Sequence, residues 1–422
     1  LWIAPVCLAC NIDFIRWGGG GLETPLYVLC ITASFAWIWY RHPAVCSAAG
    51  IAAAGAALTR PEGIIAGPLM AGAVWWVFRR NSAPKTTRTA TATLCAQRIF
   101  DWWLLIVIPY HLWRITYFGE ILPNTFYCKV SCIRTSWAHG IMYVADFFRS
   151  NGHLVLLTGA ATGCISRWQR LWPQTVLGLI LTGMVVLEGG DWMPYHRFML
   201  PILPILLLLF AAGCETCRNR FTASPGVATV TLLIAVAFLL CQPLIPHSNA
   251  ITAGFTATRH ILMGNSPSKG LIQEPVSRIT SNDETWLLGQ RAAGEWLGAN
   301  ARPGASLALG AAGVIPYYSG LRTVDFFGLV TPSVARGRKR SGWSMAGHQK
   351  YDREIILDVE PDYIVFSGTA DPSREPRWWL KKFKLLDCPE FRDNYVYRMV
   401  DIGTCRFGYY ERIAPATAQN DP

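Results

Sequence analysis

The chain has 422 residues, of which 52% are hydrophobic and only 15% are charged, and its mean hydropathy is +0.26. An ordinary soluble domain carries about 25% charged residues, so this composition argues against a purely soluble protein and favours a membrane protein. The formal net charge of +11 would suit a nucleic-acid-binding protein. However, the cations are spread over short loops between apolar runs, which excludes that class.

The first ten residues, Leu1–Cys10, have the pattern of the end of an apolar helix. They lack the basic n-region, the apolar h-region and the small-residue cleavage site of a secretory signal peptide. Because the chain also begins with Leu rather than Met, we expect further sequence to precede it.

Eight apolar runs approach the length of about 20 residues that a helix needs to cross a bilayer. In chain order they are Glu23–Tyr40, Pro43–Leu58, Gly63–Phe78, Ile99–Phe118, His153–Ile165, Pro173–Leu187, Phe198–Gly213 and Gly226–Leu244. With the partial N-terminal helix, they predict an all-α polytopic membrane domain over residues 1–244 with about eight full spans.

The loops between these runs alternate in charge. One set carries only one acid, Glu215, against ten cations: Arg41, Arg79, Arg80, Lys85, Arg88, Arg98, Arg167, Arg170, Arg218 and Arg220. The other set mixes acids with cations: Asp13, Arg16, Glu23, Arg60, Glu62, Glu120, Lys129, Arg134, Asp146, Arg149, Glu188, Asp191 and Arg197. Excess Lys and Arg mark cytoplasmic loops. We therefore expect the mixed loops, and everything after Leu244, to lie outside the cytoplasm.

The rest of the chain is more polar. A linker rich in Ser, Thr, Pro and Gly, Ile245–Asp283, precedes a predicted small extracytoplasmic α/β domain over residues 284–422. We expect helices at Glu284–Asn300 and Tyr351–Val359, and strands at Ser306–Leu309, Thr323–Phe327, Tyr363–Phe366 and Asn394–Val400. Neither GxGxxG nor GxxxxGK occurs in this domain, so it shows no nucleotide-binding motif.

The turn from Glu188 to Arg197 joins two predicted spans and holds the densest group of ionisable residues. Charges kept at a membrane boundary are costly and are therefore functional candidates. A structural interpretation is also open, in which the acids and Arg197 end helices at the headgroups while Trp192 and Tyr195 act as interfacial aromatics.

Three other stretches on the same predicted side carry acids, amides and cations: Gly20–Leu26, Thr59–Gly63 and Tyr117–Lys129. Such a set suits a reaction between a lipid-bound anionic donor and an external acceptor. A carboxylate base would activate the acceptor hydroxyl, and cations would stabilise the leaving phosphate. The candidates are Glu23, Glu62 and Asp191 for the base, and Arg60, Lys129, His196 and Arg197 for the phosphate. In the structural alternative, Arg60 pairs with Glu62 and Asn124 only turns the chain.

These stretches resemble a known family in their order along the chain. The residues on which this resemblance rests are Gly21–Leu26, Thr59–Gly63, Leu122–Lys129, Gly189–Met193 with Arg197, Gly310–Gly320, Asp325–Leu329, Gly347–Lys350 and Pro361–Tyr363. The series, from about Ile12 to about Val400, is similar to polytopic C-type glycosyltransferases, nearest the branch of the mycobacterial terminal arabinofuranosyltransferase.

The resemblance implies a multi-pass transferase of the bacterial inner membrane. It would move a sugar, such as a pentofuranose, from a polyprenyl-phosphate carrier to an extracytoplasmic glycan, lipid or protein. It also implies that Asn124 and Lys129 help to form the donor site, and that His348 and Lys350 border the acceptor site. The essential acid that such enzymes carry in their first external loop is missing here, which leaves the activity of this chain open.

Two other functions remain open: a transporter of lipids or glycolipids, and a catalytically inactive membrane assembly protein. No cofactor is indicated, and a requirement for a divalent metal is left open. The pairs Cys7 with Cys10 and Cys214 with Cys217 have a metal-ligand spacing but lack a second pair nearby. Cys388 and Cys405 are placed so that a disulfide is possible in an extracytoplasmic domain.

Overall fold

A computed structural model covers the whole chain. The residues that it describes are 2–36, 43–79, 85–129, 134–150, 153–191, 193, 195–220, 225–241, 276–310, 312–339, 350–366, 380–381, 383–385, 387–403 and 406–413. They form two compact units. The helical unit comprises Leu1–Leu122 and Cys132–Leu271, and the C-terminal unit comprises Pro123–Ser131 and Ile272–Pro422. The short segment Pro123–Ser131 thus leaves the predicted membrane domain, 1–244, and folds with the C-terminal unit.

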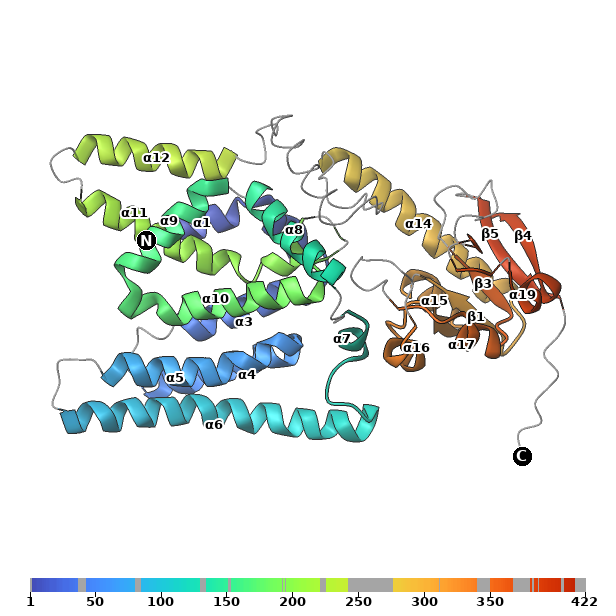
Figure 1. The fold of residues 1–422 in the computed structure, drawn as a ribbon, viewed down its shortest axis with the longest axis horizontal. Coiled ribbons are helices and arrows are strands. Elements are labelled where there is room, and N and C mark those ends of the chain that lie inside the picture. Colours follow the sequence, from blue (N-terminus) through green and yellow to red (C-terminus); the bar gives the residue numbers. More distant parts are fainter. Residues whose placement is uncertain are drawn as a thin grey trace. The chain divides into compact units, whose positions relative to one another are not determined.

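The helical unit is a bundle (Figure 1). Its helices are α1 (Ile3–Ala9), α2 (Ile12–Gly18), α3 (Thr24–Ala36), α4 (Pro43–Thr59), α5 (Ala66–Arg79), α6 (Lys85–Phe118), α8 (Arg134–Ser150), α9 (His153–Ser166), α10 (Trp168–Glu188), α11 (Leu203–Arg220) and α12 (Pro225–Cys241), with short 3-10 turns at Pro61–Ile65 and Arg197–Met199. Small residues allow close helix contacts. A Cβ at Gly140 of α8, for example, would lie 2.4 Å from the carbonyl oxygen of Val186 in α10.

Each of the eight apolar runs is largely helical, but the prediction of eight full spans is not supported. Among the described residues, three helices are long and apolar enough to cross a membrane: Pro61–Arg79, Thr89–Phe118 and Trp168–Glu188. Other apolar helices, such as Thr24–Ala36, Val45–Thr59 and Val155–Ser166, are shorter. In α11 the last turns carry Glu215, Arg218 and Arg220, so its apolar part is also short.

Helix α6 shows most clearly that part of this surface suits lipid. In the most apolar 18-residue stretch of this helix, only 28% of the residues are buried inside the protein. Its exposed apolar residues include Leu105, Ile108, Leu112, Trp113 and Ile115. An exposed apolar surface of this extent is unusual on a soluble monomer and typical of a surface that contacts a membrane or a partner.

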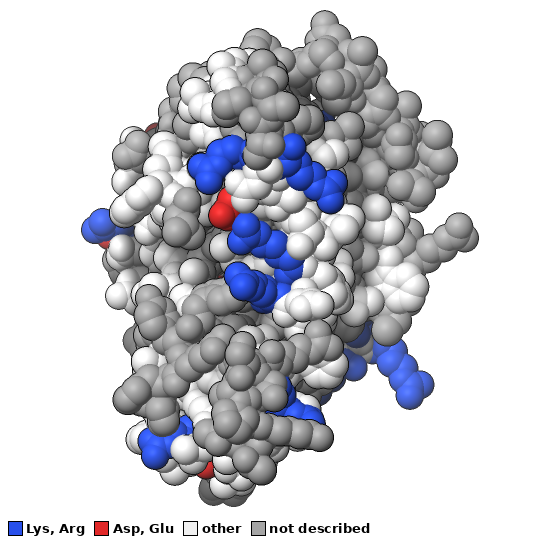
Figure 2. Space-filling view, turned by 90° about the vertical axis from the view of Figure 1, so that its left-hand side faces the viewer, with Lys and Arg blue, Asp and Glu red and all other residues white. Residues whose placement is uncertain are grey.

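The basic residues gather at one end of the helical unit. The last turn of α5 holds Arg79, the last turn of α11 holds Arg218 and Arg220, and Arg167 precedes α10. Arg167 bridges to Glu215 at 3.0 Å, and Trp76 of α5 contacts Trp172 of α10, so these helix ends lie together. Figure 2 shows Lys and Arg side chains on this face with little acidic surface between them.

The C-terminal unit is α/β, as predicted. Its elements are α7 (Asn124–Lys129), α14 (Val276–Asn300), β1 (Ser306–Leu309), α15 (Val314–Ser319), β2 (Arg322–Asp325), α16 (Pro332–Arg336), α17 (Arg353–Asp358), β3 (Tyr363–Val365), α19 (Pro389–Asn394), β4 (Tyr395–Asp401) and β5 (Arg406–Arg412). The strand order is β2-β1-β3-β5-β4. Strand β1 is parallel to β2 and β3, whereas β5 is antiparallel to β3 and β4.

The sheet is buried on both faces because its strands are apolar at successive positions. Leu307, Leu309 and Val365 pack on one side with Ala293 and Leu297 of α14. Between them in sequence, Ala308 and Ile364 point to the other side, where they join a second cluster that includes Phe326, Phe383 and Tyr410. The period of two in strand side chains produces this division.

The C-terminal unit differs from the sequence-based expectation at several elements, and the short helices α15, α16 and α19 were not predicted. Helix α14 begins at Val276, inside the predicted linker Ile245–Asp283, because no Pro or Gly interrupts the chain after Pro275 until the helix is established. Strand β5 was not predicted, since Gly408 lies in its centre. Cys388 is a free thiol next to Glu390, and Cys405 lies outside the described residues.

Helix α7 docks on a turn formed by Phe327, Gly328 and Leu329. The amide nitrogen of Asn124 donates to the carbonyl oxygens of Gly328 at 2.6 Å and Leu329 at 3.2 Å. The thiol of Cys128, which is fully buried, donates to the Gly328 carbonyl at 2.8 Å. The turn is held in place by Asp325, whose carboxylate accepts from the backbone N–H groups of Phe327 and Val330. Asn124 is therefore a structural contact of the C-terminal unit.

The docking of α7 predicts a specific effect of Asn124→Ala. Two hydrogen bonds to the Gly328 turn disappear and leave two half-buried carbonyls without this donor, which we expect to weaken docking by about 1–3 kcal/mol. The buried Cys128 thiol should then react faster with a maleimide under native conditions, measured on its own peptide by mass spectrometry. Asn300→Ala removes one hydrogen bond that a side-chain amide donates within α14, and it serves as the control. Equal protection of Cys128 in both variants would contradict the docking.

Candidate functional site

Seven charged residues of the helical unit, each at most 9% exposed, are joined into one cluster by the contacts described below. They are Asp13, Arg60, Glu62, Asp146, Arg149, Asp191 and His196. Arg197 joins them with a side chain that is 12% exposed. Burial of charged groups is expensive unless they are paired. The pairing of this cluster therefore determines what each residue is able to do.

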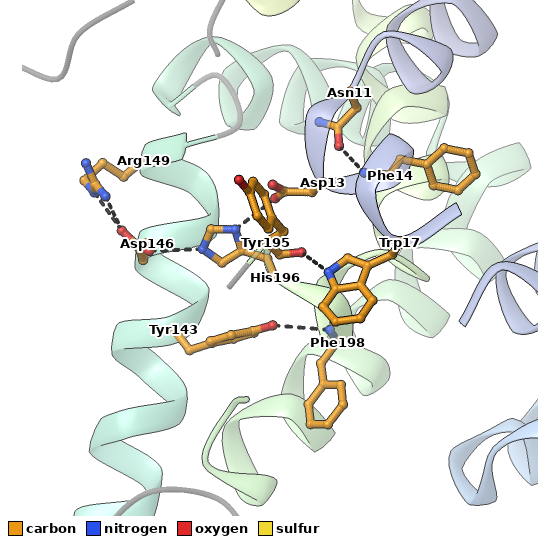
Figure 3. A network of polar contacts seen from close by, with 10 residues as sticks. All are labelled: Asn11, Asp13, Phe14, Trp17, Tyr143, Asp146, Arg149, Tyr195, His196 and Phe198. Carbon is orange, nitrogen blue, oxygen red and sulfur yellow. Dashed lines mark hydrogen bonds and ion pairs between the residues drawn. The ribbon is translucent and has the colours of Figure 1, made fainter. Parts of the chain in front are cut away.

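His196 is held between two carboxylates (Figure 3). Its Nδ1 lies 2.9 Å from Oδ2 of Asp13 in α2, and its Nε2 lies 3.1 Å from Oδ2 of Asp146 in α8. Arg149, one turn after Asp146, donates from Nε to the other carboxylate oxygen of Asp146 at 2.7 Å. The rings of Tyr143 and Phe147 flank the imidazole. Two anions thus face two cations, and the network is neutral when His196 is protonated.

This environment keeps His196 charged. Burial alone lowers the pKa of a histidine, but the charges and hydrogen bonds of Asp13 and Asp146 outweigh it and raise the pKa of His196 to about 9. At neutral pH both ring nitrogens therefore carry protons, and both donate to carboxylates. His196 has no N–H group left for a substrate phosphate, and its position makes it a link between α2, α8 and the loop before α11.

The loop that carries His196 has an unusual backbone. Gly189 and Gly190 have φ values of 83° and 74°, and they are followed by Tyr195 at 63° and His196 at 38°. For residues other than glycine this region costs about 1–2 kcal/mol each. The indole N–H of Trp17 in α2 donates to the Tyr195 carbonyl at 2.8 Å, and the two aspartates hold the next side chain. These bonds offset the strain and direct Arg197 and Phe198 towards the other charged groups.

Asp191 and Arg197 form the first of two further ion pairs. Nη2 of Arg197 lies 2.8 Å from Oδ2 of Asp191. The guanidinium carbon of Arg197 also lies 5.3 Å from the ring of Trp17 and 4.9 Å from the ring of Phe198. Aromatic neighbours at these distances favour a guanidinium electrostatically, so Arg197 is oriented by three side chains.

Arg60 and Glu62 form the second pair, with Nε of Arg60 2.5 Å from Oε1 of Glu62. The guanidinium carbon of Arg60 lies 4.8 Å from the Phe198 ring and 5.5 Å from the Tyr27 ring. Phe198 thus contacts both arginines and joins the two ion pairs into one site. The backbone N–H of Phe198 donates to the hydroxyl of Tyr143 at 3.3 Å, which ties the site to α8.

The structure brings together five of the residues that the sequence singled out: Arg60, Glu62, Asp191, His196 and Arg197. Glu23 is exposed at the start of α3, although its charge acts on Arg60. The pairing of Arg60 with Glu62, which was the structural alternative, is present.

Four other predicted residues lie elsewhere or are not described. Asn124 and Lys129 belong to α7 in the C-terminal unit. Lys350 is also in that unit and donates from Nζ to the carbonyl oxygen of Gly337 at 2.6 Å. His348 lies outside the described residues, as does the side chain of Lys129.

Sequence reasoning missed three members of the cluster: Asp13, Asp146 and Arg149. Asp13 lies in the first turn of α2, two residues after Asn11. The side chain of Asn11 caps this helix by accepting from the N–H of Phe14 at 3.0 Å. Asp146 and Arg149 are spaced i, i+3 in the sequence Ala-Asp-Phe-Phe-Arg, a spacing that places both on one helix face. Their region was expected to be a loop. A prediction of helix α8 there would have shown that Asp146 and Arg149 lie on one face.

No metal-binding group of three or more His, Cys, Asp or Glu side chains occurs among the residues that the structure describes. The carboxylates of the cluster are instead directed at cations of the protein. The arrangement therefore consists of a closed network around His196 and two ion pairs joined by Phe198. Asp191 and Glu62 each pair with a guanidinium outside the His196 network, so they are the carboxylates of the cluster best placed for acid–base chemistry.

The charge state of His196 predicts how stability depends on pH. A pKa raised from about 6.5 to about 9 stabilises the folded helical unit by about 3 kcal/mol. This contribution is fully present below about pH 6.5 and is lost as pH rises through about 9. His196→Gln should therefore lower the thermal unfolding temperature in detergent strongly at pH 6, and the difference from the natural chain should shrink towards pH 10. His111→Gln in α6 is the control, and a difference independent of pH would contradict the assignment.

Comparison with known proteins places only the C-terminal unit near a described family. A family model described as a domain of unknown function (DUF8728) matches residues 280–411. This range begins within α14 and ends within β5. No curated protein matches the chain significantly. The match thus covers the sheet and its helices, and it does not extend to the charged cluster of the helical unit.

Proposed function

We propose that this protein is a membrane glycosyltransferase that moves a sugar from a polyprenyl-phosphate carrier to a hydroxyl group outside the cytoplasm. The observation that supports this most is the buried cluster, in which paired carboxylates and arginines gather at one end of α10 in a unit with membrane-length helices. Ionisable groups at such a position are expensive and therefore functional by default. The ordered resemblance to C-type glycosyltransferases supplies the reaction type.

The orientation follows from the two ends of α10. The helix has 21 residues, and at 1.5 Å per residue it is about 31 Å long, close to the thickness of a bilayer's hydrocarbon core. Arg167 lies directly before it, and the loop with Asp191 and His196 follows it. Excess Arg marks the cytoplasmic side, so in this proposal the charged cluster opens towards the outside of a bacterial inner membrane.

In the proposed reaction an acceptor hydroxyl attacks the anomeric carbon of the donor sugar. The bond from this carbon to the phosphate oxygen breaks, the phosphate keeps the electron pair, and the configuration inverts. Asp191 takes the proton of the acceptor hydroxyl, and Arg197 stabilises the negative charge on the phosphate. His196 is a positioning residue in this scheme, because both of its nitrogens are engaged by Asp13 and Asp146.

The two alternative functions, a lipid transporter and an inactive assembly protein, make different demands on the ionisable residues. A transporter of lipids usually binds its cargo near the membrane midplane, on broken helices, whereas this cluster lies beyond the end of α10. An inactive assembly protein requires no particular protonation state at Asp191. Both alternatives remain measurable outcomes of the transfer assay.

The direct test is transfer of radiolabelled sugar from polyprenyl-phosphate donors by the purified chain in nanodiscs, with a cell-envelope extract as acceptor. Asp191→Asn keeps the shape of the side chain but removes its basicity, and we expect transfer to fall at least about 100-fold. Glu215→Gln makes the same change in a carboxylate that is paired with Arg167 at the basic end, and we expect normal transfer. Both variants are first checked for an unchanged unfolding temperature.

Three results would count against the proposal. Transfer that survives in Asp191→Asn would remove the base from this position. Movement of labelled lipid between leaflets without transfer would identify a transporter. Neither transfer nor lipid movement, with intact folding, would favour the assembly role.

A further inference from the structure

Three buried polar groups of α3 and of the Arg60–Glu62 pair have no hydrogen-bond partner: the hydroxyls of Thr24 and Tyr27, and Nη1 of Arg60. Thr24 and Tyr27 are 0% exposed, and Arg60 is 8% exposed. The two α3 residues are three positions apart, so they lie on the same face of the helix. The guanidinium of Arg60 lies 5.5 Å from the ring of Tyr27, which brings the second and third groups together.

Such a combination requires an explanation. More than about 90% of buried polar groups in proteins have a partner, and each one without a partner costs about 1–3 kcal/mol. Two other buried hydroxyls of the helical unit, by contrast, do have partners. Ser34 in the same helix donates to the carbonyl of Ile31 at 2.8 Å, and the hydroxyl of Tyr143 accepts from the N–H of Phe198. The free groups at Thr24, Tyr27 and Arg60 therefore indicate a site for an outside ligand.

The local charge determines which ligand class fits. Glu62, Glu188 and Glu23 all act electrostatically on Arg60, so acids outnumber cations around these groups. An excess of acids disfavours a phosphate at this position, and the free N–H of Arg60 disfavours a cation. Two hydroxyls and one N–H group, beside carboxylates that accept hydrogen bonds, are complementary to a neutral ligand with several hydroxyl groups.

We propose that Thr24, Tyr27 and Arg60 form the subsite for the hydroxyl groups of the transferred sugar. This inference rests on the proposed function, and it assigns the sugar ring to the Arg60–Glu62 side of Phe198 and the phosphate to the Asp191–Arg197 side. Phe198 contacts both arginines, so the two subsites are adjacent. A sugar phosphate bound in this way presents its anomeric carbon between them.

Binding of matched lipids with and without a sugar by the purified full chain tests the subsite. The probes are farnesyl-phosphate esters of arabinofuranose, mannose and glucose, and farnesyl phosphate without a sugar. We expect the natural chain to bind one of the sugar esters more tightly than farnesyl phosphate. Tyr27→Phe and Thr24→Val should each weaken binding of that ester about fivefold, the loss of one hydrogen bond, and should leave binding of farnesyl phosphate unchanged.

The controls separate a lost ligand contact from a damaged fold. Thr162→Val makes the Thr24→Val change in α9, where the hydroxyl donates to the carbonyl of Thr158, and it should not affect binding. Tyr143→Phe removes a hydroxyl that is already paired and should lower the unfolding temperature, whereas Tyr27→Phe should not.

The possible outcomes distinguish this inference from the proposed function. Equal affinity of the natural chain for farnesyl phosphate and for all three esters would overturn the sugar subsite, as would equal losses for both lipids in the variants. Binding that depends on the sugar, without transfer to any acceptor, would support the subsite and count against the transferase. Transfer that is unchanged in Tyr27→Phe and Thr24→Val would support the transferase and count against the subsite.

Discussion

The arrangement of the helical unit depends on one buried cation, His196, held between the carboxylates of Asp13 and Asp146. Removing any of these charges from water is expensive, and only a complete network compensates for the loss of hydration. The network joins residues that are far apart in sequence, in α2, in α8 and in the loop after α10. Arg149 completes it by pairing with the remaining oxygen of Asp146. Three segments are therefore fixed relative to one another by charge as well as by apolar packing.

This network separates residues that hold the site from residues that are free to act. Asp13, Asp146, Arg149 and His196 are paired with one another, so their charges are used within the protein. The left-handed backbone at Tyr195 and His196 then turns the chain so that Arg197 and Phe198 face Asp191 and Arg60. At that edge the hydrogen-bonding groups are no longer fully matched, and the unpaired hydroxyls lie there. A closed, rigid support beside an incompletely paired edge is the arrangement expected of a preorganised binding site.

Much of the fold and part of the site were predictable from the sequence because they depend on local patterns. The apolar runs identify the helices, and the strands Ser306–Leu309 and Tyr363–Val365 follow from short apolar segments between turn residues. The proximity of Arg60 to Glu62 and of Asp191 to Arg197 follows from turns of a few residues. In contrast, α8 was expected to be a loop because polar residues alternate with its apolar residues along the sequence, so no long apolar run marks it. Asp146 was overlooked for the same reason.

The sequence by itself determined that the chain has an apolar helical part and a smaller α/β part, and that charges concentrate in the turn from Glu188 to Arg197. These properties depend on hydropathy and spacing within a few turns of chain. Only the tertiary structure decided that Asp13 and Asp146 enclose His196, across separations of 183 and 50 residues, and that Asn124 binds the Gly328 turn of the C-terminal unit. Such contacts arise when distant segments pack together, and no local pattern specifies which buried charge will face which.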